Sequence, residues 1–500
     1  MDLEKSRQEF ARLQKRITGL YHAIDLLFLD GETSAPSSAT ANRISTLEVL
    51  NDTLYNLKFG HPTVELVELL TENESELNLV ERRSLEVLKK EIYRNKSIPK
   101  DKFIKHQSLI SAAHDAWHMA TEENDYELFR PYLEQIFTSI RGFAKTFNRD
   151  NPYDYCLDYH EAGSTTKLYD GVFDYVRNDV VPLLQQINEK PPIDNSCLIG
   201  DYSAPKQETL SKYIMEIMGL DLDHVGLSTS EHPFTKRLGS HLDQRITTRY
   251  SRKDFTFSLY TILFGCGYAL TEMGQGDELC YTLADGSASF GIMEGQTRFY
   301  ENIIGRSRPF IKYIFPKLKQ LFPTSIKDSS VDNLYLAINK VSASPVRMGS
   351  DEITNNLHVL VRYELEKELM NEELSFNDLP DAWAQKYKEY LGVEVKDHNH
   401  GVLQDMLWAD AAIGYFPTAV LGNAYSALML EKMHNDLNVE ECIIKGDIES
   451  INQWNREHIW KHIGLYDAHT LMEKFVGVPE INGEAYIGYL KYKYSEIYKL

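Results

Sequence analysis

Residues 255–271, FTFSLYTILFGCGYALT, form a long stretch of the chain without a formal charge. The stretch is 17 residues long, slightly short of the roughly 20 apolar residues that cross a bilayer, and it contains Ser, Thr, Tyr and Gly. We therefore expect a helix that is buried in the protein core. Why this helix carries no charge at all is explained below by the motifs on either side of it.

Helical periodicity extends over most of the remaining sequence. Apolar residues recur at intervals of three and four from Phe10 to Leu27, and at intervals of four from Leu357 to Leu369. Strict alternation, which is typical of strands, is confined to short segments such as residues 244–250. No repeat, linker or change of composition divides the chain. We predict an all-α fold in which residues 1–500 form one large, lobed domain.

The composition is that of a globular protein with an acidic balance. Of the 500 residues, 43% are hydrophobic and 25% are charged, and the formal net charge is -21. A negative surface repels phosphates, so we expect no binding to nucleic acid or to a membrane. The five cysteines are scattered without a C-x-x-C pair, and the charged start MDLEKSRQEF lacks the apolar core of a signal peptide. These features predict a cytoplasmic protein.

A series of motifs follows along the chain from Tyr153. They are YDYCLDYHEAG at 153–163, HPF at 232–234, DQRITTRY at 243–250, ENIIGRSR at 301–308, RYELE at 362–366, GVLQD at 401–405 and GYFPT at 414–418. Together and in this order they resemble the carboxypeptidase Taq family of zinc metallocarboxypeptidases. The resemblance covers nearly the whole chain, and it rests on the order of many motifs and not on any single one.

The resemblance implies a helical fold with a deep central groove, akin to neurolysin and angiotensin-converting enzyme, and a homodimer. We expect an N-terminal helical lid at about residues 1–100 and the groove with the former zinc site in residues 101–500. Members of the family remove single residues from the C-termini of peptides. Two His of an H-E-x-x-H helix and a later Glu hold their zinc ion, and the Glu of H-E-x-x-H is the general base.

This sequence departs from the family at the zinc position. Aligned with the family, H-E-x-x-H falls on residues 264–268, where Phe264 and Tyr268 replace the two His and Gly265 replaces the base. Glu294 is the only family ligand retained, in a segment MEGQTR that resembles H-E-S-Q-S-R. One carboxylate cannot hold an ion that takes three or four protein ligands. We therefore expect no zinc, and we expect Phe264, Tyr268 and Met293 to fill the space as packed core.

Other replacements point the same way. Leu407, Ala419 and Trp460 stand where the resemblance places His, Tyr and His, so positions implied to contact substrate have also changed. Cys266 has no His next to it in sequence to act as a base, which argues against a nucleophilic cysteine. His114 and His118 have the i, i+4 spacing of a metal pair but lack the following Glu, so we expect a partly exposed helix there.

Polar residues of the retained motifs are candidates for holding a peptide. The candidates are His232, Arg245, Arg249, Arg347 and Gln404. The fork of Arg347 suits a C-terminal carboxylate, and an ion pair with Asp351 or Glu352 is the alternative. His232 is either a ligand or, as part of HPF, a structural element of the groove. Arg245 pairs more naturally with Asp243 in an internal scaffold.

Two functions of different classes follow from these residues. The first is a pseudo-peptidase, which keeps the peptide-binding groove, needs no cofactor and has lost zinc-dependent hydrolysis. The alternative is an active metallocarboxypeptidase that releases C-terminal residues with zinc in a rearranged site. A structural partner of an active paralogue is a third, weaker hypothesis.

Overall fold

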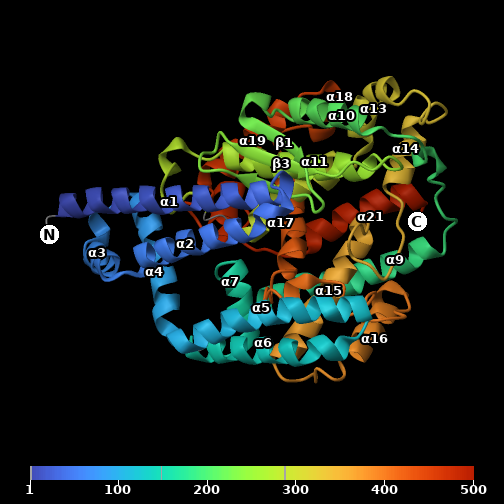
Figure 1. Ribbon diagram of the computed structural model, residues 1–500. Helices are drawn as coiled ribbons and strands as arrows, with labels where there is room; N and C mark the ends of the chain where they lie inside the picture. The colour runs from blue at the N-terminus through green and yellow to red at the C-terminus, as the bar shows by residue number, and fades with distance from the viewer. Residues whose placement is uncertain (1–2, 148, 287–288) are drawn as a thin grey trace.

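Helices form almost the whole of the computed structural model, which describes residues 3–147, 149–286 and 289–500 (Figure 1). The helices are α1 (Leu3–Thr33), α2 (Thr40–Phe59), α3 (His61–Glu72), α4 (Leu79–Ser97), α5 (Lys100–Glu123), α6 (Tyr126–Thr146), α7 (Pro152–His160), α8 (Thr166–Tyr175), α9 (Val181–Asn188), α10 (Ala204–Ile217), α11 (Thr256–Met273), α12 (Phe290–Arg298), α13 (Arg308–Leu321), α14 (Val331–Ile338), α15 (Glu352–Met370), α16 (Leu379–Leu391), α17 (Pro417–Met433), α18 (Val439–Lys445), α19 (Ile448–His458), α20 (Ala468–Leu471) and α21 (Glu484–Tyr498). The strands are β1 (Val225–Thr229), β2 (Thr235–Arg237) and β3 (Gln244–Thr248). The prediction of an all-α fold is confirmed.

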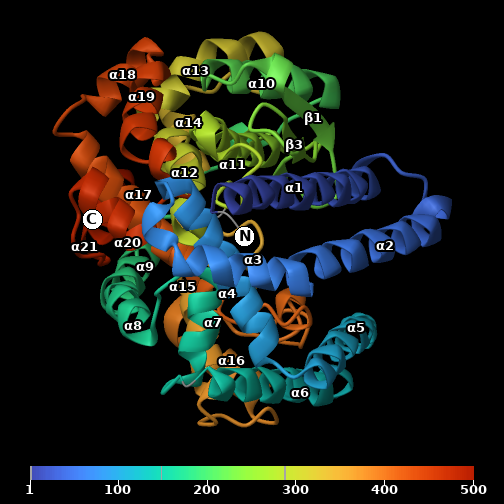
Figure 2. The ribbon, with the colours of Figure 1, turned by 90° about the vertical axis from the view of Figure 1, so that its left-hand side faces the viewer.

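The helices are arranged in two parts with the N-terminal helices between them. Figures 1 and 2 show the strands with α10, α11 and α13 on one side and α5, α6 and α16 on the other. The pair α1 and α2 runs between these sides, with α1 next to the strands (Figure 2). Among the described residues, no helix combines the length and the apolar character of a membrane span.

Two groups of buried side chains form the core. The larger one extends from α5 to α21, and the smaller one joins α1, α2, α3 and α4. The predicted apolar face of the first helix is confirmed, since Phe10, Leu13 and Ile17 are buried in the smaller group. This group also receives Leu283, which lies on the chain far from the N-terminal helices. Residues separated by some two hundred positions are thus held in one cluster.

The charge-free stretch forms most of α11, as predicted, and α11 is largely buried. Twelve of its 18 residues are buried, and the helix packs against α10, α12 and β3. Its one charged residue, Glu272, pairs with Arg237 at 2.8 Å, whereas a charge within the uncharged stretch would lose its hydration without such a partner. At Gly267 an added Cβ would lie 2.8 Å from the backbone oxygen of Gln296, so glycine permits the close approach of α11 and α12.

A small mixed sheet flanks α11. Its strand order is β1-β3-β2, with β3 parallel to β1 and antiparallel to β2. In the register, Ile246 of β3 faces Leu227 of β1 and Thr235 of β2. The segment predicted from alternation is confirmed as β3, and its buried side chains cover one face of α11.

Candidate functional site

Helix α11 presents positions 264 and 268 one turn apart on one face. The side chains there, Phe264 and Tyr268, are half-buried, whereas the three small residues between them are buried. The expected packing of these positions is only partly correct. Met293 packs against the main core, but both aromatic rings keep an exposed edge. The helix therefore shows two aromatic rings where the resemblance places two imidazoles.

The former general-base position has no space for a side chain. A Cβ atom on Gly265 would lie 2.8 Å from Cγ2 of Ile246 and 2.8 Å from Oγ1 of Thr235. Ile246 is fully buried in β3, so it cannot move aside without disturbing the core. Position 265 therefore carries no proton acceptor and offers no room for one.

Arg298 holds the retained carboxylate. Its Nε and Nη2 atoms both lie 2.8 Å from Oε1 of Glu294, one helical turn away. Its Nη1 atom donates to Oε2 of Glu301 at 2.8 Å. The guanidinium carbon lies 5.3 Å from the centroid of the Phe264 ring, within the range of a cation–π contact. The side chain next to Glu294 is thus a cation that also contacts the ring in the place of the first imidazole.

Protonation states at this position follow from these contacts. Burial works against the charge of Arg298, but Glu294 and Glu301 outweigh it and raise the pKa of the guanidinium. Burial, and next the negative charge of Glu272, raise the pKa of Tyr268. The phenol is therefore neutral at neutral pH, and a neutral phenol is a poor zinc ligand.

The residues at this position do not fit a zinc ion. Zinc takes three or four nitrogen, sulfur or oxygen ligands from a protein. Phe264 offers none, Tyr268 offers a neutral hydroxyl, and Glu294 is bound to Arg298. Within residues 3–147, 149–286 and 289–500, no group of three His, Cys, Asp or Glu side chains that could surround one ion includes Glu294.

The other replaced positions have structural contacts. Trp460 is fully buried and donates from Nε1 to Oε1 of Gln296 at 2.8 Å. Leu407 and Ala419 are partly buried and pack against the main core. Burial raises the pKa of Cys266, so its thiol stays protonated, as expected for a residue that is no nucleophile.

The pair of histidines on α5 lies on a partly exposed helix, as expected. The rings of His114 and His118 are 4.7 Å apart, His114 is half-buried and His118 is exposed. The Nε2 atom of His114 contacts Sδ of Met406 at 3.0 Å. No third metal-ligating side chain completes a group with them in the part of the chain that the structure describes.

Two of the predicted peptide-binding residues lie together. The Nη2 atom of Arg347 is 3.0 Å from Oδ1 of Asp405, and its backbone N–H donates to Oε1 of Gln404 at 3.2 Å. The guanidinium also lies over the ring of Phe416, 4.8 Å from its centroid. The Nε atom of Arg347 is buried and has no hydrogen-bond partner among the described residues. The side chain as a whole is 27% exposed, but this buried Nε atom is not itself open to a ligand.

The alternative pairing of Arg347 with Asp351 or Glu352 is wrong. Asp351 is the N-cap of α15 and accepts hydrogen bonds from two backbone N–H groups of the first turn. Glu352 pairs with Nζ of Lys493 at 2.6 Å. Asp351 and Glu352 are therefore near Arg347 in sequence, but they bind the first turn of α15 and a lysine of α21. Arg347 pairs instead with Asp405, which is 58 residues away.

The remaining candidates lie on the strand side of the molecule. Arg245 donates from Nε and Nη2 to Asp243 at 2.5 and 3.1 Å, so the expected ion pair forms, but it is not internal because both side chains are more than a third exposed. His232 is exposed in the turn between β1 and β2. Arg249 is exposed after β3, and its guanidinium lies 4.9 Å from the ring centroid of Phe257. In the described part of the chain, none of these residues bonds to the Arg347 pair.

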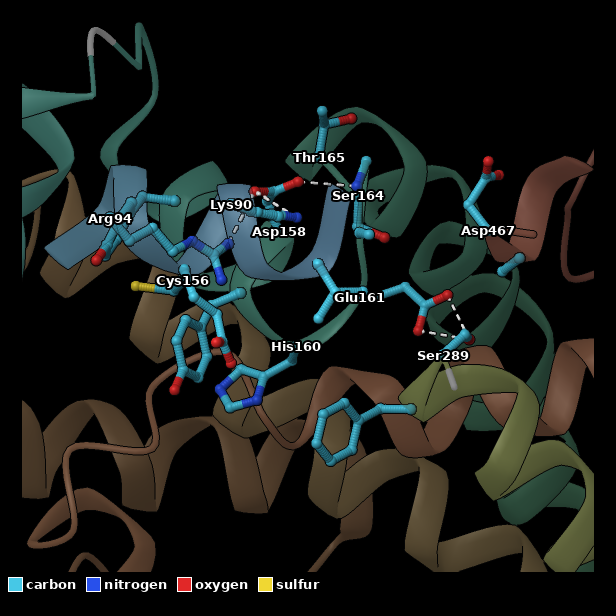
Figure 3. Close-up of a pocket in the computed structure, with 18 of the residues that line it drawn as sticks. Lys90, Arg94, Cys156, Asp158, His160, Glu161, Ser164, Thr165, Ser289 and Asp467 are labelled. Atoms are coloured by element: carbon cyan, nitrogen blue, oxygen red, sulfur yellow. Dashed lines mark hydrogen bonds and ion pairs between the residues drawn. The ribbon is translucent and has the colours of Figure 1, made fainter. Parts of the chain in front are cut away.

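The structure contains a cavity of about 1890 Å³ that is separate from the former zinc position; Figure 3 shows part of its wall. None of the residues at positions 264, 268 and 294 lines it. Its wall is formed by side chains from α2, α4, α5 and α7, and by the segments that carry Ser289 and Asp467. On this wall, Lys90 and Arg94 from α4 form ion pairs with Asp158 from α7 at 3.8 and 3.4 Å (Figure 3).

Tyr415 contacts the cavity wall and is influenced electrostatically by the retained family ligand Glu294. The ring centroid of Tyr415 lies 5.6 Å from that of His160 and 6.2 Å from that of Phe290, and both of those residues line the cavity. Burial, and next Glu294, raise the pKa of Tyr415, while Arg347 acts in the opposite direction. The ring of Tyr415 thus contacts the cavity wall, while its hydroxyl lies within the electric field of Glu294 and Arg347.

A buried carboxyl group, Glu161, and a half-buried imidazole, His160, form part of the cavity wall, and neither was predicted from the sequence. Glu161 accepts hydrogen bonds from the Ser289 hydroxyl at 2.6 and 2.8 Å and from the Gly291 N–H at 2.8 Å (Figure 3). Burial raises the pKa of Glu161 to about 7, although these hydrogen bonds oppose the shift. Burial lowers the pKa of His160 to about 4. The motif at 153–163 was the available signal, because it contains both residues.

Comparison with known proteins gives matches over nearly the whole chain. The family described as Carboxypeptidase Taq (M32) metallopeptidase matches residues 9–494. The chain is 34% identical over 505 residues to Carboxypeptidase 1 of Bacillus subtilis (strain 168), covering 100% of both. It is 31% identical over 485 residues to Thermostable carboxypeptidase 1 of Pyrococcus furiosus, covering 96% of each. The crystal structure of an M32 carboxypeptidase from Deinococcus radiodurans R1 has a TM-score of 0.96 at 27% identity, over 99% of this chain and 100% of that chain.

Proposed function

The chain belongs to the carboxypeptidase Taq (M32) metallopeptidase family, and we propose that it is a member that binds peptides without hydrolysing them. In this proposal the groove of the family persists as a binding site, and neither zinc nor another cofactor takes part. The ligand is a peptide or the C-terminal end of a polypeptide. The protein is then a binding or regulatory protein with the fold of a hydrolase.

The ion pair between Glu294 and Arg298 carries the proposal. A zinc ion on Glu294 would have to bind the remaining oxygen, Oε2, next to the positive charge of a guanidinium that already holds Oε1. Both side chains are largely buried, with Glu294 19% and Arg298 24% exposed, so solvent screens the repulsion between the two cations only in part. In return the ion would gain a single carboxylate, since neither Phe264 nor Tyr268 supplies an imidazole. The balance favours the ion pair.

The absence of a base at position 265 supports the same conclusion. Hydrolysis by a metallopeptidase needs a carboxylate that takes a proton from the attacking water. Gly265 has no side chain, and Ile246 and Thr235 fill the space beside it. A chain that had somehow kept the ion would still lack this proton acceptor.

We propose that Arg347 holds the carboxylate of the peptide. Its side chain is 27% exposed and pairs with Asp405 through Nη2, and a guanidinium can donate two parallel hydrogen bonds to a carboxylate. Gln404 positions Arg347 through the backbone N–H. His232 and Arg249 add exposed polar groups on the strand side, whereas Arg245 is occupied by Asp243.

We also propose that the protein is a cytoplasmic homodimer. The support is the resemblance to the family and the acidic composition, with a net charge of -21. Size-exclusion chromatography with light scattering tests the assembly, and a monomer at micromolar concentration would contradict it.

Zinc content and hydrolysis together test the proposal. Wild type and E294Q are purified with zinc supplied, and each is assayed for bound metal and for release of C-terminal residues from blocked dipeptides. We expect the same zinc content in both and no hydrolysis in either. Zinc that E294Q removes, with hydrolysis that a chelator abolishes, would instead establish an active metallocarboxypeptidase with a rearranged site.

A further inference from the structure

Three metal-ligating side chains gather at the far end of α11, in a place that the family's zinc chemistry does not use. They are His241, in the loop between β2 and β3, and Asp277 and Cys280, in the turn after α11. The Nδ1 atom of His241 lies 3.0 Å from Sγ of Cys280, and its Nε2 atom lies 3.3 Å from Oδ1 of Asp277. Within residues 3–147, 149–286 and 289–500, this is the one group of three such side chains whose ligand atoms lie within 4.8 Å of one another.

We propose that His241, Asp277 and Cys280 bind a divalent cation of the zinc class. A thiolate, an imidazole and a carboxylate are the ligand types that zinc takes in proteins. Zinc bonds of roughly 2.0–2.3 Å place tetrahedral ligand atoms about 3.3–3.7 Å apart. The observed separation of 3.0 Å between Cys280 and His241 is close to that range. Water completes the fourth position.

Only one of the three side chains has to move. An imidazole offers one nitrogen to an ion, and here the thiol and the carboxylate lie at different nitrogens of His241. The side chain of Asp277 is 94% exposed, so it can swing towards the ion at little cost. His241 is only 14% exposed and stays in place. On binding, the sulfur–metal bond replaces the S–H bond of Cys280, and the thiol proton passes to the buffer.

The charges around the group favour a cation. Asp285 lies close enough to act electrostatically on both Cys280 and His241. Arg237 pairs with Asp285 and, at 2.8 Å, with Glu272, so one guanidinium serves two carboxylates. With Asp277, the acidic side chains outnumber the cations near the group. A divalent ion would balance this surplus and the charge of the bound thiolate.

The ion would fix a loop that holds the N-terminal helices. After Cys280, the backbone N–H of Leu283 donates to Oε1 of Gln14 in α1 at 2.9 Å. The N–H of the next residue donates to Oγ of Ser84 in α4 at 3.2 Å. An ion that joins this loop to the β2–β3 loop would therefore stabilise the attachment of α1 and α4 to the larger core.

Cobalt binding tests the site directly, because a cobalt–thiolate bond gives a charge-transfer absorption that other ligands do not. Full-length protein is stripped with a chelator and titrated with Co²⁺. We expect one cobalt per chain with this absorption, its displacement by Zn²⁺, and its loss in C280S and H241Q. D277N should weaken cobalt binding at least about tenfold, because it removes a ligand at an exposed position where folding is undisturbed.

Two matched variants separate this site from others. C197S removes a partly exposed cysteine elsewhere, and E294Q removes the family ligand; both should bind cobalt as the wild type does. The inference is overturned if no charge-transfer absorption forms, if it persists in C280S, or if D277N binds as tightly as the wild type. A metal lost in E294Q and kept in C280S would overturn both this inference and the proposed function, whereas the reverse pattern supports both. D277N decides the matter should C280S fail to fold.

Discussion

Arg298 donates from both Nε and Nη2 to one oxygen of Glu294, so a guanidinium neutralises the single ligand that the chain retains from its family. The pair lies on one turn of α12, in contact with the ring of Phe264. A positive charge is thus present near the place where the family has its metal. It belongs to the chain itself and has no open coordination position for water or substrate.

Removing Arg298 should destabilise the fold. In R298M, Glu294 and Glu301 lose their common partner, and breaking a buried pair costs about 3–5 kcal/mol. Because these groups are partly solvated, we expect a loss of about 3 kcal/mol in the free energy of unfolding, measured with urea. The control is R252M, whose ion pair with Asp201 is exposed, and this substitution should leave the free energy of unfolding nearly unchanged. Equal losses of unfolding free energy in R298M and R252M would show that the ion pair of Arg298 with Glu294 stabilises the fold no more than an exposed ion pair does.

The lack of space for a side chain at position 265 leads to a second prediction. In G265A the new methyl group would press on Ile246 and Thr235, so we expect a loss of about 1–3 kcal/mol from overpacking. Gly142 is an exposed glycine inside α6 with no atom within 4 Å of an added Cβ. G142A should therefore raise the free energy of unfolding by about 0.5–1 kcal/mol. If G265A proves as stable as the wild type, position 265 has room for a side chain after all.

Glu161 should make stability depend on pH. Its pKa rises from 4.5 to about 7 on folding, so the folded state binds the proton more tightly. The resulting stabilisation is present at low pH and is lost as the pH rises from about 4.5 through 7. Relative to E161Q, the wild type should therefore lose up to about 3 kcal/mol between pH 4.5 and 8, at about 1.4 kcal/mol per pKa unit. Urea unfolding of both proteins at several pH values measures this, and a difference that stays flat or increases with pH contradicts the assignment.

Arg347 should govern recognition of a free carboxylate. In R347A, binding of a peptide with a free C-terminus should weaken by roughly 10- to 100-fold, since a hydrogen bond to a charged group contributes about 1.5–3 kcal/mol. Binding of the same peptide with a C-terminal amide should change little. Fluorescence anisotropy with labelled peptides measures both, and R252A is the matched arginine control. A loss that is equal for acid and amide would assign Arg347 to the scaffold.

The buried helices were predictable because their sequences leave few alternatives. A long uncharged, apolar run such as the one in α11 is stable as a helix only when it is shielded from water. The residues spaced by four from Leu357 to Leu369 in α15 are likewise all buried in the protein core. The replacement of ligands by Phe264, Gly265 and Tyr268 could likewise be read directly from the residue types. These features depend on local spacing, which the sequence contains.

The contacts that decide the site depend on tertiary structure. The partner of Arg347, Asp405, is 58 residues away, and the nearer carboxylates were misleading because helix caps and α21 occupy them. The cavity is formed by segments from α2 to residue 482, and no spacing indicates it. The pairing of Arg298 with Glu294 is different, since its i, i+4 spacing on a helix was a usable signal.

Leu283 determines where the chain can be cut. It is packed among the side chains of α1–α4, although it lies beyond α11, and it is only 8% exposed. A fragment that starts at α5 would present Leu283 and its apolar surroundings to solvent, which favours aggregation. A fragment that ends at α4 would lack a side chain that closes its small core. Anyone producing shorter versions of this protein for crystallisation or binding assays should therefore keep residues 3–97 and the segment around Leu283 in one polypeptide.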